Sequence, residues 1–294
     1  TVAQEVDMPE MPEVAALAAA LDERLRGHSI AAGHLVSFSA LKTFKIPLDA
    51  LAGLEVDGVG RHGKFIDIDA QGVHLIFHLA RGGWVTWHDV APRVPARPGR
   101  SGLALRIVLD DDSGFSLTEA GTQKHLAVYV VDDPQEVPGI AALGPDPMDP
   151  SFTVNDFRGV LKQAGKAQLK GVLRDQKRLA GIGNAYSDEI LHAARLSPFK
   201  PADGLDDDAV ADLFERLREV LGQAIASAAD VPIDKLKDAK RSGMRVHGRA
   251  GEECDVCGST ILEVSFADSS LQYCPGCQTG GKPLADRRMS KLLK

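Results

Sequence analysis

The hydrophobic positions near the start of the chain recur at the spacing of an amphipathic helix. Leu17, Leu21 and Leu25 follow one another at four-residue intervals, with polar residues between them. Such positions fall on one face of a helix. Pro12 stands at the start of this pattern, where the missing N–H of proline costs a helix little. The pattern predicts a helix over residues 12–26.

Short apolar runs follow this helix, and Gly and Asp residues separate them. Residues 64–69 alternate between polar and apolar side chains, which is the pattern of a strand with one buried face. Residues 73–79 are nearly all apolar. The runs that we predict as strands are 64–69, 73–79, 84–88, 103–109 and 126–131. One helix followed by several short strands predicts an antiparallel β-sandwich.

The pattern of hydrophobic and polar residues changes after this region. Residues 137–150 contain four prolines and two glycines, which is typical of a domain boundary. Beyond them the pattern is helical, over residues 154–163, 167–174, 185–194 and 208–229. The glycine-rich segment 180–184 (AGIGN) lies between the second and third of these helices. Two helices joined by such a turn resemble a helix–turn–helix element.

Length and composition limit the class of protein. A chain of 294 residues with 44% hydrophobic content can build one large or two ordinary globular domains. No run approaches the roughly 18 apolar residues that a membrane helix needs. Residues 1–7 are acidic and lack the apolar core of a signal peptide. We therefore expect a soluble, cytoplasmic protein.

The net charge of −7 argues against a nucleic-acid partner, but it is unevenly distributed. Residues 151–294 contain 22 Lys and Arg against 20 Asp and Glu, whereas residues 1–150 contain 12 against 21. Within 235–249 there are six basic residues and Asp238 as the only acidic one. A local basic stripe of this kind suits the phosphates of nucleic acid. An ordinary solvated surface is the alternative explanation.

All four cysteines lie in the last 41 residues, in two pairs: Cys254-x2-Cys257 and Cys274-x2-Cys277, separated by 16 residues. Each pair places two thiolates on one side of a tight turn, and two such pairs complete a tetrahedral site for one zinc ion. Because all four positions are filled by cysteine, the predicted ion is structural. Redox-active or free thiols are the alternative, but they are typical of a single pair.

Three further segments point to a family. They are MPEMPEV at 8–14, LAGIGNAYSDE at 179–189 and YCPGCQ at 273–278. In this order they resemble the start, the helix–two-turn–helix signature and the end of the zinc ribbon in the formamidopyrimidine-DNA glycosylase and endonuclease VIII family. Secondary matches are RHGKF at 61–65, HL at 78–79 and LGPDP at 143–147. The resemblance runs from residue 8 to residue 278.

The resemblance implies a fold of class α+β and a division of the chain. Residues 8–136 would form an N-terminal helix with an antiparallel β-sandwich, and 137–150 would be a linker. Residues 151–230 would form the helix–two-turn–helix DNA-binding domain. Residues 231–294 would hold the basic loop and the zinc ribbon. The implied partner is double-stranded DNA that carries a damaged or abasic nucleotide, bound between two domains by a monomer.

The resemblance also implies the catalytic residues. Pro9, once it is the N-terminal residue, would be the nucleophile, because a free α-amine with a pKa of about 8 is partly neutral at pH 7. Glu10 would be the general acid and base beside it. Lys64 would contact phosphate and assist elimination. Without the resemblance, Pro9 is an ordinary helix-start proline and Lys64 a solvated lysine on a strand.

Five residues are implied as DNA ligands. Lys64 is one, and Asn184 is the second, at the head of a helix whose N-terminus suits an anion. Asn184 is otherwise explained as a helix N-cap. The remaining three are Lys170, Arg81 and Arg249. The resemblance further implies that Glu189 holds the glycine-rich turn. We expect His62, His74 and His78 to be surface or packed residues.

The sequence departs from the family pattern at four places. Residues 1–7 precede Met8, and if the chain begins there the Pro9 nitrogen is an amide that cannot attack. Translation from Met8 followed by removal of the methionine preserves the chemistry, as does the absence of 1–7 from the native chain. Ser269 replaces an arginine that binds phosphate and assists δ-elimination. Arg81 replaces a methionine that fills the gap left by the flipped base, and EAGTQK at 119–124 replaces a loop that wedges the opposite strand.

The sequence therefore supports two alternative functions. The first is a base-excision enzyme, a glycosylase for damaged bases with AP lyase activity. The second is a non-catalytic protein of the same fold that binds damaged or abasic DNA. A zinc-ribbon protein unrelated to this family would require the matches outside the ribbon to be accidental. The sequence leaves open whether the lesion is an oxidised purine, an oxidised pyrimidine or an abasic site.

Overall fold

The computed structural model describes residues 8–92, 102–266 and 269–285. It divides into two compact units. Of the described residues, unit 1 contains those up to 142 together with 227–239, and unit 2 contains 143–226 and those from 240 onward. No helix within the described residues is both long and apolar enough to span a membrane.

Helix α1 (Met11–Leu25) opens unit 1 and confirms the predicted N-terminal helix. Glu10 is its N-cap, in a capping box with Glu13: each side chain is paired with the backbone N–H of the other residue. The Glu10 N–H donates to Glu13 Oε2 at 2.8 Å. The helix buries Leu17, Leu21 and Leu25 in the core of unit 1.

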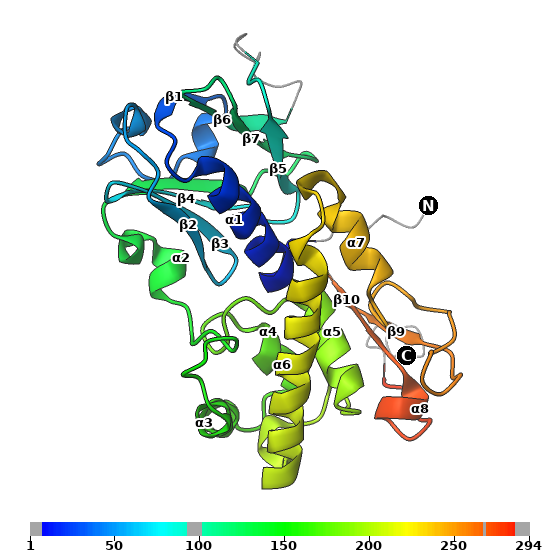
Figure 1. The fold of residues 1–294 in the computed structure, drawn as a ribbon. Coiled ribbons are helices and arrows are strands. Elements are labelled where there is room, and N and C mark those ends of the chain that lie inside the picture. Colours follow the sequence, from blue (N-terminus) through cyan, green and yellow to red (C-terminus); the bar gives the residue numbers. More distant parts are fainter. Residues whose placement is uncertain (1–7, 93–101, 267–268, 286–294) are drawn as a thin grey trace. The chain divides into compact units, whose positions relative to one another are not determined.

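Unit 1 also contains two antiparallel four-stranded sheets; their strands lie around α1 in Figure 1. One has the order β1-β6-β7-β5 and the other β2-β3-β4-β8. Helix α1 lies beside β2 and β3. The strands are β1 (Ile30–Leu35), β2 (Gly58–His62), β3 (Phe65–Ala70), β4 (Val73–His78), β5 (Gly83–His88), β6 (Leu103–Leu109), β7 (Gly114–Glu119) and β8 (Ala127–Val131). The predicted β-sandwich is confirmed.

The core of unit 1 combines residues of both sheets with α1. Ile66 and Phe77 of one sheet and Phe115 of the other are fully buried in it, and the rings of Phe77 and Phe115 lie 6.1 Å apart. Residues 227–239 add Ile233 and Leu236 to the same core. The short elements of unit 1 are η1 (Phe38–Ala40), η2 (Leu48–Leu51), η3 (Pro134–Glu136), α2 (Pro138–Ala141) and η5 (Ile233–Lys235).

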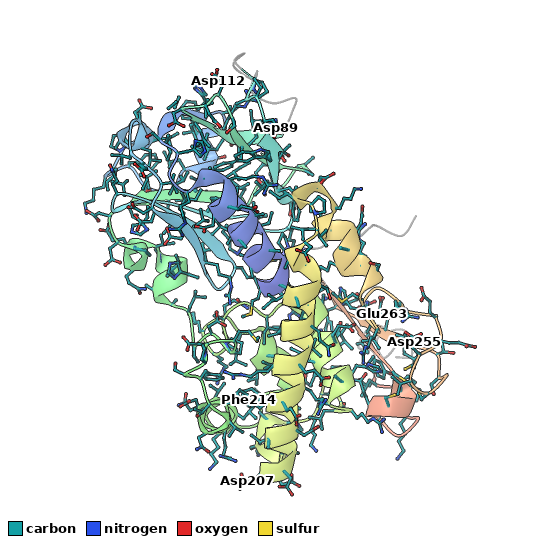
Figure 2. The ribbon with its side chains drawn as sticks, in the orientation of Figure 1. Asp89, Asp112, Asp207, Phe214, Asp255 and Glu263 are labelled. Atoms are coloured by element: carbon teal, nitrogen blue, oxygen red, sulfur yellow. The ribbon has the colours of Figure 1, made fainter. Side chains whose placement is uncertain are left out.

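Unit 2 begins with helical elements. They are α3 (Val154–Ala164), α4 (Leu169–Arg174), α5 (Asn184–Ala193), η4 (Ala202–Gly204) and most of α6 (Asp207–Ala229). Phe214 of α6 packs against Phe152 and Phe157, with ring centroids 6.0 and 5.6 Å away. Figure 2 labels Phe214 on this helix. These contacts bury the apolar face of α3, whose Phe157 is fully buried.

The last part of the chain is a small ribbon. After α7 (Leu236–Ser242), strands β9 (Leu262–Ser265) and β10 (Ser270–Tyr273) pair antiparallel, and α8 (Pro275–Gln278) follows. Val264, Leu271 and Tyr273 form a small apolar cluster on it. Asp255 and Glu263 are exposed residues of this region (Figure 2). So few apolar residues cannot stabilise a ribbon alone, and a further source of stability is needed.

Candidate active site and metal centre

Pro9 and Glu10 are buried at the start of α1, and Glu10 is only 2% exposed. The capping box fixes the Glu10 carboxylate at the N-terminus of the helix, because one of its oxygens accepts from the first-turn backbone. The partial positive charge of a helix N-terminus stabilises a carboxylate there. The local sequence therefore places an acidic group directly beside the Pro9 nitrogen in the chain.

Lys64 lies in the two-residue turn between β2 and β3, whose facing residues are His62 and Phe65. The prediction placed it on the strand, but the strand begins only at Phe65. Gly63 has a φ of +55°, which favours glycine in a tight hairpin turn. Lys64 is only 8% exposed. It is therefore a constrained lysine within the fold of unit 1 and not a freely solvated one.

His78, at the end of β4, is the titratable neighbour that Lys64 influences. The register Phe65–His78 brings the end of β4 next to the turn. The His78 ring is 4.7 Å from that of Phe65, and its Nδ1 accepts a hydrogen bond from the Ala80 N–H at 3.1 Å. Burial, and secondarily the charge of Lys64, lowers the pKa of His78 to about 4. The imidazole is thus neutral at pH 7, with its proton on Nε2.

The lowered pKa of His78 predicts an acid-sensitive stability. Because the folded-state pKa lies below the unfolded value, this contribution is complete above pH 6.5 and is lost as the pH falls toward 4. We expect up to about 3 kcal/mol of unfolding free energy to disappear over this interval. Urea unfolding of the wild type and of His78→Gln, from pH 7 to pH 4, measures it. Replacement of the exposed His125 by glutamine is the control. If His78→Gln leaves the slope of the unfolding free energy against pH unchanged, the prediction is wrong.

Arg81 is exposed on the turn between β4 and β5. The turn is rigid: the Gly83 N–H donates to the Leu79 carbonyl at 2.8 Å, and Ala80 has a φ of 52°. A Cβ on Gly83 would lie 2.1 Å from the Leu79 oxygen, so no other residue fits there. The turn therefore presents the side chain of Arg81 from a fixed backbone.

The segment 119–124 is tied to the same turn. The Ala120 N–H donates to the Gly82 carbonyl at 2.9 Å. The buried carboxylate of Glu119 accepts the N–H groups of His125 and Leu126, at 2.6 and 2.9 Å. Both segments that depart from the family pattern on this unit thus form one connected, ordered region.

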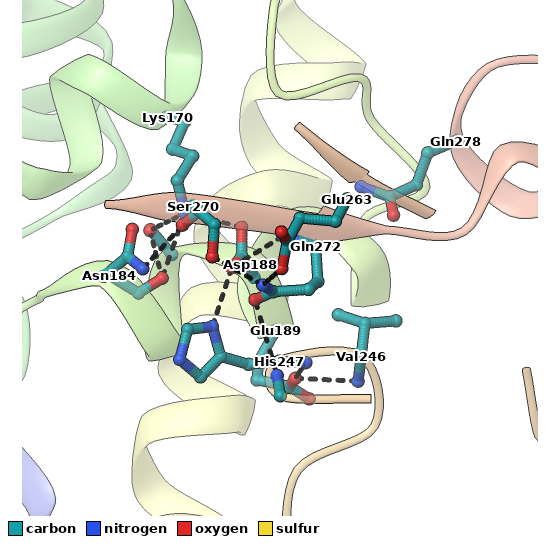
Figure 3. Close-up of polar contacts among 12 residues, drawn as sticks. Lys170, Asn184, Asp188, Glu189, Val246, His247, Glu263, Ser270, Gln272 and Gln278 are labelled. Atoms are coloured by element: carbon teal, nitrogen blue, oxygen red, sulfur yellow. Dashed lines mark hydrogen bonds and ion pairs between the residues drawn. The ribbon is translucent and has the colours of Figure 1, made fainter. Parts of the chain in front are cut away.

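In unit 2, Asn184 is the first residue of α5, and Gly183 is its N-cap. The structure therefore excludes the interpretation of Asn184 as the N-cap. Its Nδ2 donates to the Ser270 carbonyl on β10 at 2.8 Å (Figure 3). Its Oδ1 is buried and has no hydrogen-bond partner within the described residues. This side chain connects the glycine-rich turn to the ribbon.

Lys170 is buried, with 5% of its surface exposed, and is directed into the fold. Its Nζ lies 2.5 Å from Asp188 Oδ1 and donates to Ser187 Oγ at 2.9 Å and to the Asn184 carbonyl at 3.0 Å (Figure 3). A lysine in these contacts holds the first turn of α5. The geometry leaves the predicted contact of Lys170 with DNA without support, because its ammonium group is enclosed by protein acceptors.

Asp188 continues this network toward the ribbon. It is fully buried, and its Oδ2 lies 2.9 Å from His247 Nδ1 and accepts the Gln272 N–H at 3.2 Å. One carboxylate therefore joins a lysine of α4, a histidine of the segment after α7 and a backbone group of β10. Nothing in the sequence pattern singled out Asp188 or His247.

Glu189 holds a different turn from the one that the resemblance implied. Its carboxylate accepts the backbone N–H groups of Arg245, Val246 and His247 at 2.8 to 2.9 Å. Burial raises the pKa of Glu189 against the opposing effect of these hydrogen bonds. The glycine-rich turn is held by Gln176 instead, which accepts the Gly181 N–H at 2.9 Å and donates to the Ile182 carbonyl at 2.6 Å.

Arg249 forms ion pairs with two acidic neighbours. Its guanidinium donates to Glu252 at 2.8 Å and to Asp255 at 2.7 and 3.1 Å. The hydrogen bonds to Asp255 and then Glu252 raise its pKa. Its side chain is 23% exposed, so the predicted DNA contact would compete with these ion pairs.

The four cysteines converge in the ribbon. Cys257 Sγ lies 3.3 Å from Cys274 Sγ, and Cys254 Sγ lies 3.9 Å from Cys277 Sγ. A tetrahedral thiolate site with metal–sulfur bonds of ~2.3 Å has sulfur atoms about 3.8 Å apart. Gly258, with a φ of +72°, closes the first turn, and a Cβ on Gly276 would lie 2.9 Å from Cys257 Sγ. The donor set fits a structural metal ion.

The sulfur atoms differ in their surroundings. Cys254 and Cys274 are buried, whereas Cys257 is exposed. Hydrogen bonds from Ser259 lower the pKa of Cys257 to about 6, and burial raises the pKa of Cys274 and of Cys277. A histidine also lies beside the cysteines: Nε2 of His192, on α5, is 3.4 Å from Cys254 Sγ.

Three family descriptions match consecutive parts of the chain. The formamidopyrimidine-DNA glycosylase N-terminal domain matches residues 8–125, and the H2TH domain of the same glycosylase matches residues 143–233. The zinc finger found in FPG and IleRS matches residues 251–280. The formamidopyrimidine-DNA glycosylase of Heliobacterium modesticaldum is 33% identical over 281 residues, which cover 92% of this chain and 100% of that protein. The chain belongs to the formamidopyrimidine-DNA glycosylase family.

Two further examples illustrate what this chain is similar to. An uncharacterised formamidopyrimidine-DNA glycosylase-like protein of Mycobacterium tuberculosis is 54% identical over 153 residues, covering 52% of this chain and 95% of that protein. The crystal structure of Lactococcus lactis formamidopyrimidine-DNA glycosylase, non-covalently bound to DNA with an AP site, has a TM-score of 0.78 and 25% identity. The match covers 92% of this chain and 99% of that one.

Membership of the glycosylase family assigns a common fold to the parts described above. The β-sandwich of unit 1 with Pro9, Glu10 and Lys64 lies within the N-terminal domain match. The turn before Asn184 lies within the H2TH match, and all four cysteines lie within the zinc-finger match. The predicted family and fold are thereby confirmed. The roles predicted for single residues stay predictions.

Proposed function

We propose that this protein is a DNA glycosylase with AP lyase activity, which acts on damaged bases in double-stranded DNA. The observation that carries the proposal is the buried Pro9–Glu10 pair at the N-terminus of α1, in a chain of the glycosylase family. The relative from Lactococcus lactis was solved on DNA with an AP site, which supports such DNA as the partner. Since the proposed substrate is chromosomal DNA, we expect the protein in the cytoplasm, at the nucleoid.

The proposed reaction begins at the nitrogen of Pro9. As the N-terminal residue after removal of Met8, Pro9 has a secondary amine with a pKa of about 8, of which a usable fraction is neutral at pH 7. Its lone pair attacks C1′ of the damaged nucleotide and the bond from C1′ to the base breaks, with the amine proton passing to the departing base. The C1′–O4′ bond of the sugar then opens as O4′ takes up a proton, which leaves an iminium link between Pro9 and C1′. Loss of a C2′ proton then expels the 3′ phosphate by β-elimination and nicks the strand.

Other residues of unit 1 serve this step. Glu10 moves protons as general acid and base, because the capping box holds its carboxylate at the start of the same helix. Lys64, constrained in its turn next to neutral His78, would hold a phosphate of the damaged strand. Arg81, on its rigid turn, is the residue that would meet the gap in the duplex left by a flipped base.

Unit 2 contributes binding and support. We propose that Asn184 contacts phosphate at the N-terminus of α5 and that the ion of the four-cysteine site is Zn²⁺, which four thiolates favour. The ion would fold the ribbon, and the reaction proceeds without it as a reactant. The basic residues 235–249 would add sequence-independent attraction to the phosphates.

A second candidate function is a damage-binding protein without catalysis. Ser269, in place of an arginine, and the altered segments at Arg81 and 119–124 favour it, because they remove or replace the groups expected to grip the lesion. A chain that retained residues 1–7, which lie outside the described residues, would act only in this way, because its Pro9 nitrogen would be an amide without an available lone pair for attack.

Borohydride trapping on an abasic duplex distinguishes the catalytic function from the non-catalytic one. We expect a chain that begins at Pro9 to form a covalent adduct and to nick the strand, and a chain that begins at Thr1 to bind the duplex but form no adduct. Pro12→Ala in the chain that begins at Pro9 is the matched control, because it changes a neighbouring proline that is never the terminus. Intact mass of the protein from its native host shows which chain exists. A Pro9 chain that binds but never traps supports the second candidate.

A further inference from the structure

His192 reaches the metal centre from the helix that begins at Asn184. The residue is 3% exposed, and its Nε2 lies 3.4 Å from Cys254 Sγ. This nitrogen and the sulfur atoms of Cys254, Cys274 and Cys277 all lie within 4.8 Å of one another. Since the four cysteines already supply the four ligands of a structural site, His192 is a fifth group at the centre.

Two roles fit a ring nitrogen at this distance: a metal ligand, or a hydrogen-bond donor to a thiolate. The other ring nitrogen separates them. Nδ1 of His192 is buried and has no hydrogen-bond partner within the part of the chain that the structure describes. A histidine that binds metal through Nε2 carries its proton on Nδ1 and almost always donates it to a partner. Ligation would therefore leave a buried N–H without an acceptor, which is rarer in proteins than an unused acceptor.

We propose that His192 is a positioning residue of the metal centre, whose Nε2–H donates to the Cys254 thiolate. Four thiolates around a divalent ion carry a net charge of −2. Cys254 is only 2% exposed, so water cannot solvate its share of that charge. A hydrogen bond to a charged acceptor is about twice as strong as one between neutral groups. The donation therefore stabilises the thiolate as a ligand and withdraws electron density that an electrophile would attack.

The contact also ties α5 to the ribbon at a third point. Near its start, Asn184 and Asp188 bond to the backbone of β10. The next residue, Glu189, holds residues 245–247. His192, eight residues after Asn184 and about 12 Å along the helix, reaches the first cysteine pair. The position of Asn184 and the state of the metal site are thereby coupled through one short helix. This inference rests on the metal ion assigned to the ribbon, and not on the proposed catalytic chemistry.

The tautomer of His192 tests the assignment in the intact, zinc-loaded chain without DNA. A long-range ¹H–¹⁵N correlation spectrum of the imidazole rings is expected to show a protonated Nε2 and an unprotonated Nδ1 for His192. A protonated Nδ1 with a metal-shifted Nε2 would make His192 a ligand and overturn the proposal. Because no activity enters this measurement, failure of the glycosylase proposal leaves it unaffected.

Two variants give a second readout. His192→Phe, loaded with Co²⁺, is expected to keep the absorption spectrum of a four-thiolate site, and in its zinc form to lose the ion to a chelator about tenfold faster. His192→Gln retains an N–H donor and should restore most of the slow release, which a purely space-filling role does not predict. Equal release rates for the wild type and His192→Phe would overturn the proposal, as would a cobalt spectrum that has lost a ligand.

Discussion

Replacement of Cys274 by serine is expected to remove the metal ion and to unfold the ribbon. Cys274 is fully buried, its sulfur lies 3.3 Å from Cys257 Sγ, and the Cys277 N–H donates to it at 3.4 Å. The described ribbon buries only a few apolar side chains, so metal binding supplies most of its stability. Structural zinc contributes about 10–16 kcal/mol in small domains, and the loss of one thiolate removes most of that.

The experiment compares metal content, circular dichroism and affinity for an abasic duplex. We expect metal per chain to fall from one ion to nearly none and DNA binding to be lost, while the β-sandwich of unit 1 stays folded. Val256→Ser is the matched control, because this half-exposed residue lies between Cys254 and Cys257, the other predicted pair of ligands, and binds no metal itself. A Cys274→Ser protein that retains its ion and its affinity for DNA would falsify the structural-metal assignment.

The elements of this fold that could be predicted were those whose side chains repeat with a clear period. Helix α1 and strands β3 and β4 bury one face or both, and their apolar positions follow that burial. Strand β1 was missed because its sequence, IAAGHL, contains two alanines and a glycine and buries mainly Ile30. Strand β2 (GVGRH) has a single apolar side chain, so its place is fixed by pairing with β3 rather than by its own pattern.

The return of residues 227–239 to unit 1 could not be read from the sequence either. Helix α6 has a continuous helical pattern, so it gives no sign that the chain changes units near residue 227. The return is stabilised by tertiary contacts, such as the hydrogen bond from Trp84 Nε1 to the Ile233 carbonyl at 3.1 Å and Lys237 above the Trp84 ring at 4.5 Å. Contacts between residues so far apart in the chain leave no local signal.

The residues of the candidate site likewise fall into those that the sequence predicted and those that it did not. The cysteine spacing predicted the metal ligands, and the segments at 8–14 and 179–189 indicated the family through their resemblance to it, because each is a local pattern in the sequence. The partners of Asp188 and His192 come from distant segments, so these residues were not predicted. Lys170 was predicted as a DNA ligand, and only its surroundings show where its charge is directed.

Lys170→Met is expected to destabilise unit 2 by about 3–5 kcal/mol, because it leaves the charge of Asp188 buried without its principal cation. Asp188 has no exposed surface, and His247 and the Gln272 N–H remain as its neighbours. The double variant Lys170→Met with Asp188→Asn removes both charges and should recover part of the loss. Arg158→Met is the control, since its ion pair with Asp207 is largely exposed on the acidic side and should contribute at most about 1 kcal/mol.

Urea unfolding, and the salt dependence of DNA affinity, separate an internal role of Lys170 from a DNA contact. Replacement of an internal lysine lowers the unfolding free energy, and the slope of log affinity against log salt stays the same in the folded fraction. Replacement of a phosphate ligand would leave stability nearly unchanged and reduce that slope by about one. The second result would show that Lys170 leaves Asp188 to reach DNA, and that the buried network of Figure 3 opens when DNA binds.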